Sequence, residues 1–222
     1  MYILEERLNN ISRKLQQLKA SSKRMEIFGG IQHGFRSNKI SPAAIERFEI
    51  KNNISIPGEL RTFLLQIGSG AGPDLGIYNL DEMQEEYTAW QTCFSSPSLM
   101  NGEFDFNKDN AVDIIQHWNE NPKAYYYKKL STVNGLMPIQ TEGCTYYHFI
   151  VMTGELRGKI WSLNTEEFDT LPARLDTELS FYDWYEKWLD ESLAKIEVSF
   201  IQTAGNYPTA ADKRKWWQKL FL

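Results

Sequence analysis

The chain begins with apolar residues at helical spacing. Five of them are separated by intervals of four and three residues: Leu4, Leu8, Ile11, Leu15 and Leu18. This spacing places them on one face of a helix, which we expect over residues 3–24. The seam covers about two heptads, fewer than the three or four of a coiled coil. The helix therefore either docks on its own domain or pairs with a partner.

A glycine-rich and polar stretch follows at residues 25–40, which predicts a linker or loop. Ser41 and Pro42 then open a helix that ends near Asn52, because serine caps helices and proline suits the first helical position. Leu60, Phe63, Leu64 and Ile67 recur at the spacing of a buried helix face. The run Gly68–Pro73 predicts the end of that helix and a turn. Its glycines lack the lysine and the strand context of a phosphate-binding loop.

The next part of the chain mixes short elements. We expect a short strand at Ile77–Leu80, a polar helix at Asp81–Gln91, irregular structure at 93–106 and a helix at 108–119. After residue 134 the pattern changes to β-branched and aromatic runs separated by glycines. These runs predict consecutive antiparallel strands at Leu136–Thr141, Thr145–Met152 and Lys159–Leu163.

A stripe of large apolar residues, from Phe181 to Ile196, predicts a closing helix over about 180–198. Ser180 can cap it, with Asp183 three residues later. Residues 199–211 have no clear pattern, and 213–222 form a basic aromatic tail. The order of helices, sheet and closing helix indicates an α+β fold, with an antiparallel or mixed sheet and helices flanking it.

Charge is unevenly distributed along the 222 residues. Residues 1–39 carry 8 basic and 3 acidic side chains, residues 40–204 carry 12 and 25, and residues 205–222 carry 4 and 1. We call residues 40–204 the acidic body. An acidic body argues against nucleic acid as a direct ligand, which requires clustered Lys and Arg. The basic ends either dock on the acidic body or recruit something else.

Composition narrows the class of protein further. Cys93 and Cys144 cannot form a disulfide framework and fit no zinc spacing, so we expect reduced thiols. The charged N-terminus lacks the apolar core of a signal peptide, and the longest apolar run, Phe149–Met152, is too short to span a membrane. We expect a cytoplasmic protein without a transmembrane segment.

Motifs for catalysis or metal binding are weak. His33, His117 and His148 are far apart in sequence, and no G-x-S-x-G elbow is present. Adjacent carboxylates are common, but most lie in polar context, unlike the raised-pKa acid of a glycosidase. We therefore expect no catalytic residue, no metal and no cofactor. A His–Ser contact or a buried carboxylate cluster in a deep pocket would favour an uncharacterised hydrolase instead.

Several motifs in order resemble a known family. They are Ile45-x-x-Phe48-Glu49, Ile54-x-Ile56-Pro57-Gly58-Glu59-Leu60-Arg61-Thr62-Phe63-Leu64 with Gly68-Ser69-Gly70, Gly135-Leu136-Met137-Pro138-Ile139, Gly158-Lys159-Ile160-Trp161, and Ser180-Phe181-x-x-Trp184-x-x-x-Trp188-Leu189. Together they resemble the SUKH superfamily. The resemblance implies a non-catalytic α+β domain over residues 40–198, with a longer 81–134 segment. An N-terminal helix and linker (1–39) and a basic tail (199–222) are additions.

The resemblance also implies a binding role. Bacterial members of the superfamily are similar to immunity proteins against polymorphic toxins, often nucleases, and its yeast relatives to regulators of cell-wall synthesis. We expect a cytoplasmic immunity protein, a monomer or weak dimer, that binds a protein toxin domain. A regulatory scaffold using residues 1–39 and 205–222 is the alternative. The expected contact residues are acidic or aromatic: Asp81, Glu82, Glu85, Glu86, Trp90, Glu142, Glu166, Glu167 and Asp169.

Overall fold

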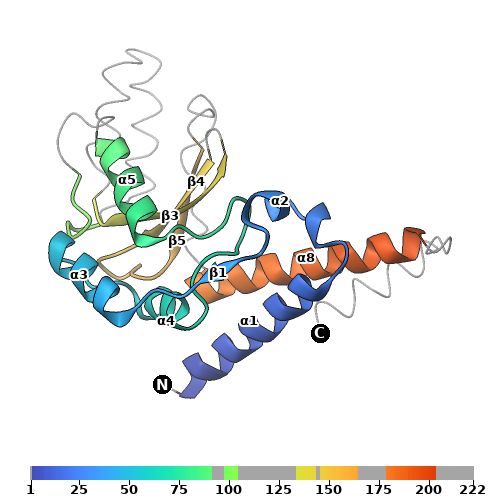
Figure 1. Ribbon diagram of the computed structural model, residues 1–222. Coiled ribbons are helices and arrows are strands. Elements are labelled where there is room, and N and C mark those ends of the chain that lie inside the picture. Colours follow the sequence, from blue (N-terminus) through green and yellow to red (C-terminus); the bar gives the residue numbers. More distant parts are fainter. Residues whose placement is uncertain (1, 92–97, 105–133, 144–145, 165–178, 204–222) are drawn as a thin grey trace, which may run out of the picture.

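The computed structural model describes residues 2–91, 98–104, 134–143, 146–164 and 179–203. Helices flank a three-stranded antiparallel sheet, and a small two-stranded sheet lies apart from it. Figure 1 shows the long helices α1 and α8 side by side below the sheet, with α5 above them. The predicted α+β fold is confirmed.

The N-terminal seam is buried inside this domain. Helix α1 (Tyr2–Ala20) packs along α8, and Leu8, Ile11, Leu15 and Leu18 are at most 3% exposed, whereas Leu4 is 38% exposed. These four side chains belong to the same hydrophobic core as α3, α4, α8 and the sheet. Of the two roles open to the helix, docking on its own domain is the one the structure adopts.

The stretch predicted as a linker is folded. It contains η1 (Arg24–Glu26), α2 (Gly30–His33) and β1 (Ser37–Asn38). Ile27, His33 and Phe35 are buried, and the His33 and Phe35 rings pack edge to face. Prediction of a loop was wrong in this respect because local turn residues, not long periodic runs, build these elements.

The two helices expected after residue 41 are present as α3 (Pro42–Asn52) and α4 (Gly58–Gln66). Ala44 N donates to Ser41 Oγ at 3.3 Å, and Pro42 occupies the first helical position, as predicted. Leu60, Phe63 and Leu64 are fully buried. Both helices therefore contribute their predicted apolar faces to the core.

A glycine turn follows α4. Gly68 has φ +108°, and a β-carbon there would meet the Asn38 carbonyl at 2.3 Å, so only glycine fits. The turn leads into β2 (Ser69–Gly70), which pairs antiparallel with β1. The chain then crosses to the main sheet, where Leu75 N and Tyr78 N donate to Thr141 O and Ile139 O.

Residues 77–80 do not form the predicted strand. Of the backbone amides in this stretch, only Tyr78 N donates a hydrogen bond to the main sheet. Leu80 already begins α5 (Leu80–Gln91). Asn79 Oδ1 accepts from Asp81 N and Glu82 N, while Glu82 Oε2 accepts from Asn79 N. This reciprocal capping box starts the helix one residue earlier than expected and ends the extended segment.

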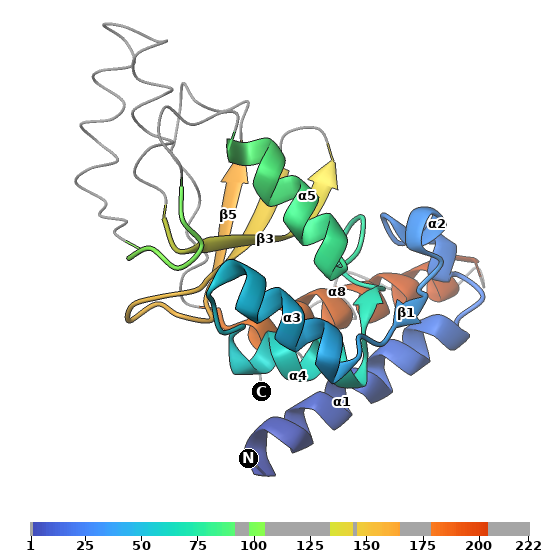
Figure 2. The same cartoon turned by 60° about the vertical axis from the view of Figure 1, so that its left-hand side comes forward.

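The main sheet has the order β3-β4-β5 and confirms the three antiparallel strands. They are β3 (Leu136–Gly143), β4 (Tyr146–Val151) and β5 (Ile160–Asn164). One face packs Met137, Ile150 and Ile160 against the main core. The opposite face holds a smaller cluster of Leu136, Phe149, Val151 and Trp161. Figure 2 shows α5 crossing in front of this sheet.

Helix α8 (Phe181–Thr203) closes the fold on its predicted stripe. Phe181, Tyr185 and Leu189 are fully buried, and Phe63 of α4 packs edge to face on the first two. Asp183 N donates to Ser180 Oγ at 3.3 Å, which confirms the predicted cap, and Asp183 Oδ2 accepts from Ser180 N in return. Within the part of the chain described, no helix is long and apolar enough to cross a membrane.

The predicted helix at 108–119 lies outside the described residues, as do both cysteines. The basic tail from 213 onwards lies outside them as well. Residues 199–203 were expected to lack regular structure, but their backbone is helical and forms the last part of α8.

Candidate functional site

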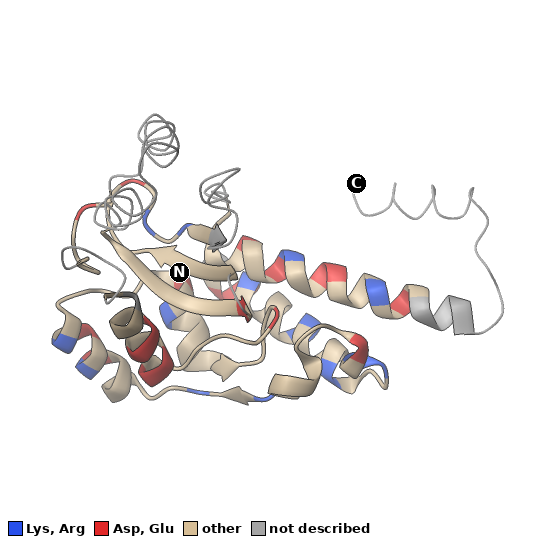
Figure 3. Cartoon of the chain, turned by 90° about the horizontal axis from the view of Figure 1, so that it is seen from above, with Lys and Arg blue, Asp and Glu red and all other residues tan. Residues whose placement is uncertain are grey.

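Helix α5 carries an exposed acidic surface, which we define as Asp81, Glu82, Glu85 and Glu86. The first three are exposed and Glu86 is half-buried. Figure 3 shows this helix as a concentrated block of acidic residues. Among the described residues, no Lys or Arg nitrogen lies within 4 Å of these four carboxylates. Their negative charge is thus available to a binding partner.

The members of this acidic surface differ in their environment. Glu82 also serves as the capping residue of α5 through its 2.6 Å bond to Asn79 N. Burial, and next the adjacent Glu85 charge, raise the pKa of Glu86. Glu85 is exposed and has no Lys or Arg nitrogen within 4 Å among the described residues, so it is the clearest binding candidate of the set. Glu82 is in part a structural residue.

Three acids of α8 are in the opposite situation. Arg7 of α1 pairs with Asp183 at 2.6 Å, and Lys14 pairs with Glu186 at 2.9 Å and Asp190 at 2.7 Å. Although burial opposes it, hydrogen bonds to Asp190 and Glu186 raise the pKa of Lys14. The basic N-terminal helix therefore neutralises part of the acidic body from within the molecule.

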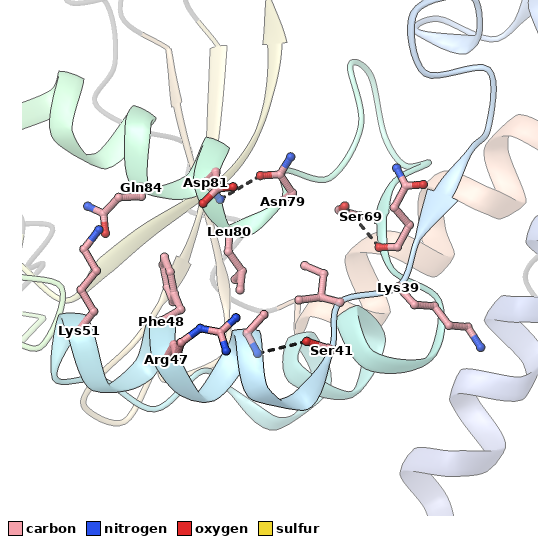
Figure 4. A pocket seen from close by; sticks show the side chains of 13 residues that line it. Lys39, Ser41, Arg47, Phe48, Lys51, Ser69, Asn79, Leu80, Asp81 and Gln84 are labelled. Carbon is pink, nitrogen blue, oxygen red and sulfur yellow. Dashed lines mark hydrogen bonds between the residues drawn. The ribbon is translucent and has the colours of Figure 1, made fainter.

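A groove runs between α3 and α5, next to the acidic surface. Its volume is about 530 Å³. Figure 4 shows Lys51 of α3 reaching toward Gln84 of α5, with Arg47 extending along α3 below Asp81, and Lys39 also lines the groove. The α3 wall thus carries two cations, Arg47 and Lys51, and the α5 wall one carboxylate, Asp81. Such a groove suits a partner segment that carries both charges.

A second polar group lies at the end of the main sheet. His148 of β4 contacts Glu142 of β3 through Nε2 at 2.8 Å and Ser162 of β5 through Nδ1 at 2.7 Å. The three residues share one face because strand pairing sets His148 opposite Ser162, and a register shift lies at Glu142. The His148 side chain is 8% exposed. This is a hydrogen-bonded Ser–His–Glu chain.

Two further residues complete this group. Asp74, in the loop after β2, has a carboxylate oxygen 2.9 Å from Gln140 Nε2. Burial, and then the Glu142 charge, raise the pKa of Asp74 to about 6. Ligand atoms of Asp74, Glu142 and His148 all lie within 4.8 Å of one another. We call these three residues the sheet-end cluster.

Sequence reasoning found only one member of the sheet-end cluster, Glu142. It missed the others because 74, 142 and 148 belong to a loop and two strands, and no short motif spans them. His148 and Ser162 could be paired only once the strand register was known. Glu142 lies at this cluster, not on α5, so the expected contact residues fall into two groups.

The remaining predicted contact residues are not placed. Trp90 lies in the last turn of α5, but its side chain is outside the described part of the structure. Glu166, Glu167 and Asp169 lie outside the described residues altogether. Their contribution to binding stays a prediction.

Comparisons with known proteins agree with the fold. The model of the SMI1 / KNR4 family (SUKH-1) matches residues 39–187, from the end of β1 into α8 and more than half of the chain. Searches of curated proteins and of solved structures returned no significant match. The matched segment contains α5, the sheet-end cluster and all residues lining the groove except Asn38, while α1 lies before it. The chain belongs to the SMI1 / KNR4 family (SUKH-1).

Proposed function

We propose that this protein binds and neutralises a protein toxin domain, without catalysis, through the acidic surface of α5. The observation that carries the proposal is the contrast between two helices. Asp183, Glu186 and Asp190 of α8 are paired with Arg7 or Lys14 of α1, whereas the four acids clustered on α5 have no described cation within 4 Å. Unpaired exposed carboxylates on one helix form a surface complementary to a basic partner.

A toxin that cleaves nucleic acid is the partner class this charge favours. An active site that holds phosphates is lined with Lys and Arg, so an acidic helix could occupy it and block access. Electrostatic attraction of this kind speeds association and weakens with salt. The adjoining groove between α3 and α5 supplies further contact area beside the charged helix.

The scaffold alternative receives less support. It required the N-terminal seam as a partner element, but Ile11 and Leu18 of that seam are fully buried against the protein's own core. The hydrolase alternative required a His–Ser contact within a deep pocket, and only the contact is found. His148 and Ser162 are in contact, but the groove is lined by other residues, and none of the Ser–His–Glu chain is among them.

The test is binding of the purified full chain to the toxin domain encoded beside its gene. We expect a stable complex that inhibits the toxin, with an association rate that falls as salt rises. Replacing Asp81, Glu85 and Glu86 by their amides should slow association about 10-fold or more at low salt.

The matched control replaces two exposed acids of α8 that have no described cation within 4 Å, Glu191→Gln and Glu197→Gln, which should leave association unchanged. Failure to bind the neighbouring toxin domain would refute the function. Binding that is indifferent to salt and to the α5 changes would refute only the role of the acidic surface.

A further inference from the structure

Three chemically suitable ligands meet at the sheet-end cluster. Asp74 comes from the loop after β2, Glu142 from β3 and His148 from β4, and their ligand atoms lie within 4.8 Å of one another. Tetrahedral bonds of about 2.1 Å would separate the ligand atoms by about 3.4 Å. Small side-chain movements would therefore bring all three onto one ion. No other group of this kind occurs among the described residues.

The ligands are held by the surrounding structure. Gln140 Nε2 donates to Asp74 Oδ2 at 2.9 Å and to the carbonyls of Pro73 and Thr141, which fixes the Asp74 loop against β3. His148 is held by Ser162 on one side and by the Trp184 ring, 5.2 Å between centroids, on the other. Ligands held in this way need little ordering when an ion binds.

A buried polar atom next to the cluster has no hydrogen-bond partner among the described residues. This atom is Oε1 of Gln140, a residue that is completely buried. Its amide contacts Asp74 directly, so the unsatisfied oxygen belongs to the same polar group. Buried polar atoms are rarely left without a partner, and water or an ion commonly supplies one. A hydrated cation at the cluster would provide such a water.

Charge favours a cation as well. Two carboxylates, Asp74 and Glu142, approach one imidazole, so like negative charges repel each other at the cluster. Neither has a Lys or Arg within 4 Å among the described residues. A divalent ion would relieve this repulsion between partly buried like charges.

We propose that Asp74, Glu142 and His148 bind a divalent transition-metal cation, with zinc as the representative ion. One imidazole with two carboxylates suits zinc, cobalt or manganese better than calcium or magnesium, which prefer oxygen ligands alone. His148 coordinates through Nε2. The imidazole keeps its single proton on Nδ1, from which it donates to Ser162 Oγ, as metal-bound histidines do to an outer partner. Water completes the coordination.

The bound ion would link the Asp74 loop to β3 and β4, and so stabilise the end of the sheet. This inference does not depend on toxin binding. Toxin binding and metal binding can be refuted separately, since no ligand of the proposed metal site lies on α5.

The experiment uses the full chain with Cys93 and Cys144 replaced by serine, so that thiolates do not compete for the metal. The protein is stripped with chelator and titrated calorimetrically with zinc chloride, then with magnesium chloride. We expect one zinc per chain and no comparable magnesium binding. Cobalt(II) should give a visible spectrum without a sulfur charge-transfer band.

Variants then test the ligand set. Asp74→Asn suits the left-handed backbone at φ 50°, and Glu142→Gln replaces a partly exposed side chain, so both should fold. Each should weaken zinc binding at least about 10-fold, and Ser162→Ala by about 10-fold. Glu85→Gln on α5 is the matched control and should leave affinity unchanged. Circular dichroism in chelator checks the fold of every variant.

Two results would overturn the proposal. One is the absence of saturable zinc binding by the stripped protein. The other is zinc binding with equal affinity in Asp74→Asn, Glu142→Gln and Glu85→Gln, which would place the ion elsewhere.

Discussion

Arg7 of α1 donates a hydrogen bond to Asp183 Oδ1 at 2.6 Å, while the other oxygen of Asp183 accepts from Ser180 at the start of α8. One carboxylate therefore both caps the closing helix and attaches the N-terminal helix to it. Burial alone would raise the pKa of Asp183, but the bonds from Ser180 and Arg7 lower it overall.

Replacing Asp183 by alanine removes the ion pair and the bonds from Ser180 to the carboxylate, while the backbone N at 183 still donates to Ser180 Oγ. We expect the free energy of unfolding to fall by about 1–2 kcal/mol, most of it from the lost bonds with Ser180, because exposed ion pairs contribute little. Urea denaturation at pH 7 measures this change in the free energy of unfolding. Glu191→Ala, on the exposed side of the same helix, should change stability by less than about 0.5 kcal/mol. Equal effects of the two changes would contradict the double role.

The buried seam of α1 predicts that this helix is part of the core. Ile11→Ala leaves a cavity at a position with no exposure and should cost about 2–4 kcal/mol. Leu4→Ala, at the exposed end of the same seam, should cost less than about 1 kcal/mol. Chemical denaturation distinguishes them. A small effect at Ile11 would mean that α1 detaches freely in solution.

His33 predicts a loss of stability in mild acid. Burial lowers its pKa to about 4, and its Nδ1 accepts from Phe35 N at 2.9 Å. Because the unfolded chain binds the proton more readily, stability should fall as pH drops from about 6.5 to about 4. After allowance for solvent screening we expect a loss of about 1–2 kcal/mol.

His33→Asn tests this by removing the titrating group, since its side-chain oxygen can still accept from Phe35 N. The comparison is the stability difference between pH 7.5 and pH 4.5, measured by urea denaturation. The difference should be smaller in His33→Asn than in the original protein. If His33→Asn and the original protein showed the same pH dependence of stability, His33 would not be the cause of the loss in acid.

Glu82 and Glu85 of α5 should contribute differently to stability. Glu82→Ala breaks the capping box with Asn79 and should cost about 1 kcal/mol. Glu85→Ala should change stability by less than about 0.5 kcal/mol, because it has no described partner. Thermal or urea unfolding measures both. A destabilising Glu85→Ala would show that this carboxylate supports the fold and is a poor choice for binding variants.

The elements with strong periodicity were predictable. The seam of α1, the Ser41–Pro42 start of α3, the apolar face of α4 and the Ser180–Asp183 cap of α8 are local patterns, set by side-chain spacing within one element. The three strands were predictable for the same reason. The short elements between residues 24 and 38 were not, because part of their support comes from pairing with distant residues: β1 pairs with β2, and Ala71 N donates to Arg36 O.

The acidic surface of α5 could be read from the chain, since four acids in six residues on a helix share its exposed side. The sequence alone could not show which acidic helix has its carboxylates paired with cations and which does not. Arg7 and Lys14 are separated by more than 170 residues from their partners on α8. Their pairing depends on how two helices pack.

The sheet-end cluster shows the same division most clearly. Sequence patterns were enough to predict the fold class, the helix faces, the strands and the uneven charge, because each depends on neighbours within a few positions. Packing brought Asp74, Glu142, His148 and Ser162 together and assigned the basic N-terminal helix to α8. Strand register and helix docking govern those contacts, and both are set by burial of apolar surface across the whole chain.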